Sequence, residues 1–235
     1  MLHDIHSHTF HSFCGRDDPH LTVQAAIDGG LELFGISDHN YGVTRDGRAE
    51  SIGEYLAFLT SIRDEYADKI RIVRGIELCT IPDKALRDDM DISGFDFCLV
   101  ENIDHPESVI KPDEKGVSGI FAYSERLKCR TGIAHSNLFR FAQAHGIAPI
   151  DFFTNLARYG IFWEMNVSYD SIHSYREHQY VKDFMASEEQ QDIIRRSGIE
   201  ISVGFDGHRV EDYRADRVKD CCIFLEEHGI KTVSL

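Results

Sequence analysis

The feature that most constrains the fold of this chain is a regular alternation of apolar runs with amphipathic stretches. Seven runs have the composition of buried strands: 5–9, 33–37, 70–79, 95–103, 131–135, 160–166 and 199–205. Helix-like stretches occupy 21–29, 54–68, 118–129, 151–159, 177–196 and 212–228, and 80–90 is expected to be a loop or hairpin. This alternation predicts an α/β fold with a parallel sheet. About seven such units favour a closed or distorted barrel over an open sheet.

Composition limits the class of protein. The chain has 235 residues, of which 42% are hydrophobic, so we expect one domain over residues 1–235. It contains no long apolar run and no signal-peptide pattern near its first residue, which predicts a cytoplasmic protein without a membrane partner. The six cysteines form no CxxC pair and are expected to be reduced thiols. The net charge of −15 makes a long nucleic acid an improbable partner, but bound divalent cations would still allow a small anionic substrate.

Metal-seeking side chains follow the first and the last apolar runs. The segment "LHDIHSHTFHSFCG" contains His6 and His8, which alternation along a strand would point to the same side, whereas His3 is out of step and expected outside the barrel or at its lower end. The segment "SVGFDGH" ends with Asp206 and His208, which have the same spacing. Two imidazoles held side by side are a ready metal-binding pair.

The intervening runs also end in residues that can bind a metal. These are Asp38, His39, Glu77, Asp104, His105, His135, Glu164 and Asn166. Any one of them alone is more often a hydrogen-bonded cap or a solvated tip. Their coincidence is informative, because the carboxyl ends of barrel strands gather at one mouth, where such folds keep their active sites. The remaining histidines are expected to be ordinary surface residues: His20, His145, His173, His178 and His228.

The motifs "DIHSHT", "ISDH", "RGIE" and "FDGH" occur in this order, with "IAHS" as a weaker fifth. In this arrangement the chain resembles the PHP (polymerase and histidinol phosphatase) family along nearly its whole length. The resemblance implies a distorted (β/α)7 barrel with a trinuclear metal site. It further implies that the first metal is held by His6, His8, Glu77 and Asp206, and the second by His39 and His208. Glu77 would bridge to a third metal, bound by His135 and a residue near His105.

The chain departs from the family pattern at two positions. The family usually has His or Asp where this sequence has Cys14. Three interpretations stay open: the Cys14 thiolate binds zinc, His11 or Asp17 takes its place as ligand, or the metal at this position is weakly held. The middle-strand histidine is expected slightly before His105, so a local bulge would bring Asp104 or His105 into place. The ligand set permits Zn, Mn or Fe.

A carboxylate-bridged metal cluster suits hydrolysis of a phosphate monoester, because divalent metals lower the pKa of bound water and neutralise phosphoryl charge. The catalytic residues are then expected to be Glu77, Asp206 and His208. Arg140 and Arg209 are candidate phosphate-binding residues, with Arg16, Arg45 and Arg48 as further candidates. The motifs lean weakly toward the histidinol-phosphatase branch of the family, and therefore toward a small substrate such as a histidinol phosphate.

Two other functions stay open. The first is a metal-dependent amidohydrolase, which also begins its barrel with an HxH pair but usually needs a carboxylated lysine in mid-barrel and at most two metals. The second is a non-catalytic, metal-binding PHP domain, for which Cys14 in place of the usual ligand is the cue. The sequence does not predict the oligomeric state.

Overall fold

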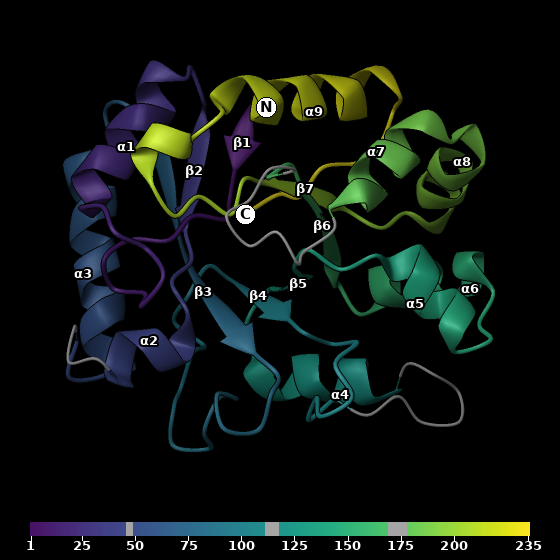
Figure 1. Ribbon diagram of the computed structural model, residues 1–235, viewed down its shortest axis with the longest axis horizontal. Helices are drawn as coiled ribbons and strands as arrows, with labels where there is room; N and C mark the ends of the chain where they lie inside the picture. Colours follow the sequence, from purple (N-terminus) through teal and green to yellow (C-terminus); the bar gives the residue numbers. More distant parts are fainter. Residues whose placement is uncertain (46–48, 111–117, 169–177) are drawn as a thin grey trace.

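The computed structural model describes residues 1–45, 49–110, 118–168 and 178–235, and for residues 44, 45 and 118 the backbone only. Seven parallel strands follow one another in sequence order around a single sheet. They are β1 His3–Asp4, β2 Leu33–Ile36, β3 Arg71–Cys79, β4 Phe97–Glu101, β5 Thr131–Ile133, β6 Phe162–Asn166 and β7 Ile201–Gly204. In Figure 1 the strands surround the centre of the molecule.

The first and last strands close this sheet into a barrel. The amide of Ile5 donates to the carbonyl of Val203 over 3.1 Å, and Ser7 forms a parallel bridge with Gly207. Because β1 contacts both β2 and β7, the sheet has no long free edge. The α/β barrel of seven parallel strands that the alternating pattern predicts is thus confirmed.

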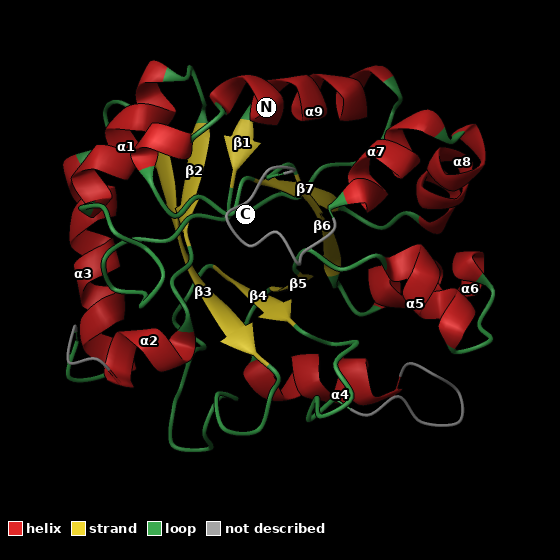
Figure 2. Cartoon of the chain, viewed as in Figure 1, coloured by secondary structure: helices red, strands yellow, loops and turns green. Residues whose placement is uncertain are grey.

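Helices form a ring outside the strands, as Figure 2 shows. They are α1 Pro19–Asp28, α2 Asn40–Arg45, α3 Ile52–Glu65, α4 Ser118–Leu127, α5 Leu138–Ala144, α6 Pro149–Arg158, α7 Gln179–Ala186, α8 Glu188–Ser197 and α9 Ala215–Glu227. A short 3₁₀ turn, η1 Val210–Asp212, precedes α9. Residues 80–96 contain neither helix nor strand, in agreement with the expected loop at 80–90.

Side-chain caps explain where several helices begin. Asp18 accepts a hydrogen bond from the amide of His20 ahead of α1, and Pro19 starts the helix. The expected helix 177–196 is instead two helices, because Ser187 has extended backbone and caps α8 through the amide of Gln190. The sequence analysis also missed α2 and α5; Asn137 caps α5 by accepting from the amide of Arg140.

The first strand is shorter than expected. It covers residues 3–4, before the expected 5–9, and beyond it side chains take up some of the backbone amides that a strand would pair with its neighbours. The Asp4 carboxylate accepts from the amide of His6, and Asp38 accepts from the amides of Thr9 and Ser12. The amide of Ser37 donates to the carbonyl of Ser7 and the amide of His8 to that of Gly207, so the start of this segment still lies between the ends of β2 and β7.

The barrel interior is apolar at one end and polar at the other. A compact cluster fills the apolar end: Ile5, Leu33, Val73, Phe97, Leu99, Ala134, Phe162 and Val233. Val233 reaches it because the segment after α9 pairs with β7, so the last residues of the chain lie inside the ring of strands in Figure 1. The larger cluster packs the helices against the outside of the sheet. Within the described ranges no helix has the length and apolar character needed to cross a bilayer.

Candidate metal centre

The polar end of the barrel is organised around Glu77 on β3, whose side chain is fully buried. Its Oε1 lies 2.9 Å from Nε2 of His135 and 3.4 Å from Nε2 of His6. Its Oε2 lies 2.8 Å from Nδ1 of His39 and 3.4 Å from Nε2 of His8. One carboxylate thus contacts four histidines, which come from the segments that follow β1, β2 and β5.

Asp206 makes a second set of contacts just beyond β7. Its Oδ1 lies 3.0 Å from Nε2 of His8 and 3.5 Å from Nε2 of His6. The residue adopts a left-handed φ of 57°, which is uncommon for a residue other than glycine and is often found at functional sites. His208 donates from Nδ1 to the carbonyl of Asp206 over 2.7 Å, which leaves Nε2 as its lone-pair nitrogen.

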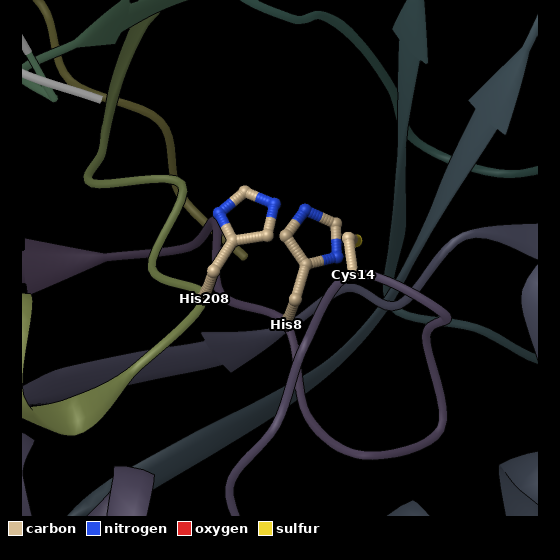
Figure 3. Close-up of side chains that lie close together, drawn as sticks. All are labelled: His8, Cys14 and His208. Atoms are coloured by element: carbon tan, nitrogen blue, oxygen red, sulfur yellow. The ribbon is translucent and has the colours of Figure 1, made fainter. Parts of the chain in front are cut away.

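Cys14 lies with two of these imidazoles. The ligand atoms of His8, Cys14 and His208 all lie within 4.8 Å of one another, and Figure 3 shows the three side chains grouped together. His11 instead packs against Tyr55 and Phe58, with ring centroids 5.3 and 4.5 Å apart. Of the alternatives weighed from the sequence, the structure therefore brings Cys14 to the cluster and turns His11 toward α3.

Asp17, the third alternative, is used elsewhere. Its Oδ2 accepts from the amide of Val210 over 2.6 Å, which ties the loop after β1 to η1. The loop itself is held by Asp38, whose Oδ1 accepts from the amides of Thr9 and Ser12. These bonds fix the path of the segment that carries Cys14.

The electrostatics of the centre favour charged ligands. Burial opposes ionisation of Glu77, but His39 and His6 outweigh it and hold its pKa well below the usual value. The pKa of Asp206 is also lowered, because His6 and His208 overcome the effect of burial. Burial likewise opposes ionisation of Cys14, yet the neighbouring His208 and His39 rings lower the pKa of its thiol. Deprotonated oxygen and sulfur atoms are the forms that bind metals.

Glu164 on β6 holds two of the clustered histidines in place. It accepts from Nδ1 of His6 and from the backbone amide of His135, both over 2.7 Å. Gly204 makes room for this contact, because a Cβ there would lie 2.1 Å from Oε1 of Glu164 and 2.6 Å from Cβ of His6. The sequence analysis named Glu164 as a strand-end residue but gave it no role.

The sequence analysis overlooked Glu101 at the end of β4. This buried carboxylate has Oε1 3.6 Å from Nδ1 of His39 and Oε2 3.9 Å from Nε2 of His135. The structure does not bring Asp104 or His105 into the cluster; both are exposed, and Nδ1 of His105 accepts from the amide of Glu107. β4 ends earlier than the expected 95–103, and no bulge carries Asp104 or His105 inward.

One histidine expected at the surface belongs near the centre. His178 is buried, and its ring stands at 88° to that of His135 with centroids 6.1 Å apart. His145 is exposed, His20 and His228 are partly exposed, and His173 lies outside the described residues.

The candidate phosphate-binding arginines have different surroundings. Arg140 on α5 is exposed and lines a cavity of about 810 Å³ that also reaches His135. Arg209 pairs with Glu211 over 3.3 Å and lines a small space beside Phe34 and Tyr213, so this geometry favours Arg140. Arg16 is exposed near the loop of Cys14. Arg48 lies outside the described residues, and Arg45 is described only in its backbone.

The donor set fits divalent metal ions. Four overlapping triads can each offer three ligand atoms: His8–Cys14–His208, His6–Glu77–His135, His6–His8–Asp206 and His8–His39–Glu77. In the described part of the chain, the ion-pair partners of Glu77 are all histidines, with no lysine or arginine to compensate the buried carboxylate. Imidazole, carboxylate and thiolate together suit Zn, Mn or Fe.

Comparisons with known proteins agree with this geometry. A probable histidinol-phosphatase of Deinococcus radiodurans is 26% identical over 154 residues, which cover 59% of this chain and only 58% of that protein. The fold is similar to that of the histidinol phosphate phosphatase of Lactococcus lactis, solved with zinc, L-histidinol and phosphate, with a TM-score of 0.64 at 14% identity over 98% of this chain and 95% of that one. No protein-family model matches the chain.

The chain resembles the histidinol phosphatases of the PHP family. A second structural relative, a putative histidinol phosphatase of Listeria monocytogenes, has a TM-score of 0.50 at 17% identity, covering 89% of this chain and 96% of that one. The HxH segment of this chain follows β1 and its DxH segment follows β7, so the two lie side by side at the same mouth of the barrel. This is the arrangement expected for a PHP-type barrel. Cys14 and Glu101 are the two positions where this centre departs from the expected ligand pattern.

Proposed function

We propose that this chain is a metal-dependent phosphatase that hydrolyses a small phosphate monoester, with histidinol phosphate as the first substrate to test. The observation that carries the proposal is the convergence of four histidines on the buried carboxylate of Glu77 at the mouth of the barrel. The likeness to a histidinol phosphatase fold supports the choice of substrate class.

The proposed centre holds three divalent ions. His6, His8, Glu77 and Asp206 would hold the first; His39, His208 and Cys14 the second; and His135 with Glu77 the third. Glu101 replaces His105 as the further ligand near His135. When bound, these ions supply an activated water molecule and neutralise the charge on the phosphoryl oxygens.

Residues of the chain orient the metal ligands and bind the substrate. Glu77 and Asp206 stay ionised and keep the imidazoles in place, while Glu164 fixes the Nδ1–H tautomer of His6. His208 is kept in one tautomer by the carbonyl of Asp206. Arg140 stands beside the cavity next to His135, where it can bind a phosphate oxygen or a polar group of the leaving alcohol.

The test begins with the metal content of the purified protein and its turnover of a phosphate-ester panel that includes L-histidinol phosphate. Chelation should abolish turnover, and Zn or Mn should restore it. Glu77→Gln should lose metal and turnover, whereas Glu107→Gln, an exposed carboxylate outside the cluster, should lose neither. Turnover that persists in thoroughly metal-free protein would contradict the proposal.

The same experiment, with amides added to the substrate panel, separates the two other functions. Full metal content without turnover of any phosphate ester would identify a non-catalytic metal-binding domain. Two ions per chain together with hydrolysis of amides alone would identify an amidohydrolase.

A further inference from the structure

Asp4 is the last residue of β1, two positions before the proposed ligand His6, and is fully buried. Its Oδ1 accepts from the amide of His6 over 3.0 Å and from the amide of Phe205 over 3.1 Å. Its Oδ2 accepts from the hydroxyl of Tyr213 over 2.9 Å. One carboxylate therefore joins the segment after β1 to the segment after β7 at the residues next to the proposed ligands.

The same junction determines the unusual backbone of Asp206. The amide of Asp206 donates to the carbonyl of His6 over 2.8 Å, one residue beyond the bond from Phe205 to Asp4. These two successive hydrogen bonds hold the chain where Asp206 takes its left-handed φ of 57°. Such a conformation costs of order 1 kcal/mol or more and persists only when its surroundings enforce it.

The conformation has a clear geometric result. It directs the Asp206 carboxylate toward Nε2 of His8 and Nε2 of His6, at 3.0 and 3.5 Å. The same carboxylate of Asp4 sets the position of His6, because it accepts a hydrogen bond from the amide of His6. Tyr213 fixes the second oxygen of Asp4 from the helix layer, where its ring packs edge-on to those of Phe34 and Phe205.

We infer that Asp4, itself fixed by Tyr213, is a positioning residue that aligns His6 and Asp206 as joint ligands of one metal ion. This inference rests on the proposed function, since it assumes that His6, His8 and Asp206 hold a metal. The hydrogen bonds of Asp4 go to the amides of His6 and Phe205 and to the hydroxyl of Tyr213, so it acts through the backbone next to the ligands. Second-layer residues of this kind typically contribute 10- to 100-fold to metal affinity.

The test measures zinc affinity by competition with a chromophoric chelator, in parallel with the free energy of unfolding of the metal-free protein. Asp4→Ala is expected to weaken the binding of one zinc ion by about 10- to 100-fold. Asp4→Asn should keep most of the affinity, because its amide oxygen can still accept from His6 and Phe205. Tyr213→Phe should produce a smaller loss than Asp4→Ala, and it keeps the inference testable if Asp4→Ala does not fold.

Asp96→Ala is the matched control. Asp96 also joins two segments, through the amide and guanidinium of Arg74, but it precedes β4 at the end of the barrel away from the centre. It should lower the free energy of unfolding without changing zinc affinity. Folded Asp4→Ala with wild-type zinc affinity, or with a loss no larger than that of Asp96→Ala, would overturn the inference alone. A wild-type protein that binds no metal would overturn the proposed function itself.

Discussion

Nδ1 of His6 lies 2.7 Å from Oε1 of Glu164, and both side chains are wholly buried. The other carboxylate oxygen of Glu164 accepts from the backbone amide of His135. A single acidic side chain thereby fixes the ring of one proposed ligand and the main chain of another, and it leaves Nε2 of His6 directed at Glu77 and Asp206.

Glu164→Ala should weaken metal binding by about 10- to 100-fold, because the His6 ring loses its orientation and the His135 amide loses its acceptor. Excess zinc should recover part of the turnover. Glu164→Gln should lose less, since the amide oxygen can still accept one of the two bonds. Zinc titration measures the effect, with Glu200→Gln as the control, because Glu200 forms its ion pairs with Arg130 and Lys231 instead. Unaltered zinc affinity in Glu164→Ala would show that His6 needs no such support.

Cys14→Ser should lose one metal ion and most of the turnover, because a hydroxyl is a much poorer ligand than a thiolate. Cys14→Asp should retain the ion with a preference shifted toward Mn. Elemental analysis and turnover with Zn or Mn measure both effects. Cys129→Ser is the matched control, since Cys129 is also a half-buried free thiol but contacts the carbonyl of Phe95 instead. If Cys14→Ser keeps the full metal content, the thiol is not a ligand.

Arg140→Ala should raise KM for the phosphate ester by about five- to tenfold and change kcat much less, because an exposed arginine contributes a charge-assisted hydrogen bond to binding. Steady-state kinetics at saturating metal separate the two constants. Arg158→Ala removes an exposed arginine of α6 and should alter neither. A fall in kcat at constant KM would place Arg140 in the chemical step instead of in binding.

The contribution of His3 to the stability of the fold should fall in acid. Burial lowers the pKa of this imidazole to about 4, against 6.5 for a free side chain; its Nε2 accepts from the amide of Val203. The folded state therefore binds a proton less readily than the unfolded state. This contribution, of order 3 kcal/mol, is present above pH 6.5 and is lost as the pH falls toward 4. The difference in free energy of unfolding between the wild type and His3→Gln, measured on metal-free protein from pH 7 to 4, isolates this contribution from that of Asp4, whose pKa burial raises to about 7. An NMR titration that places the His3 pKa near 6.5 would contradict the prediction.

The general architecture could be predicted because strand and helix periods alternate along the whole chain, and burial on both faces gives parallel strands continuous apolar runs. The limits of single elements could not. β1 ends early because the nearby Asp4 takes up the amide of His6 and the distant Asp38 takes up the amide of Thr9. The break between α7 and α8 did have a local signal, namely Ser187 followed by Glu188 and Glu189, a typical helix start.

The site was predictable where its residues follow strands at a fixed register, as for His6, His8 and Asp206. Glu101 also stands at the end of an apolar run, but Asp104 and His105, which follow it, are metal-ligand types as well. Only the position at which β4 ends shows that Glu101 faces the cluster and that the other two are exposed. His178 had no such signal. It precedes a helix, and its burial beside His135 depends on the docking of α7, which no local pattern encodes.

The hydrogen bonds of Asp4 that join the segments after β1 and β7 have a consequence for how the protein folds. His6 and Asp206 stand 200 positions apart, so their meeting requires one of the longest loop closures available to this chain, and non-local contacts of this kind form slowly. A growing polypeptide has no complete first-metal triad until its seventh strand has docked. An ion bound by His6, His8 and Asp206 would stabilise the closed barrel, because it would bind only where the segments after β1 and β7 meet. The metal-free protein is therefore expected to open first at the seam between β1 and β7, and the metal-loaded protein to unfold more slowly.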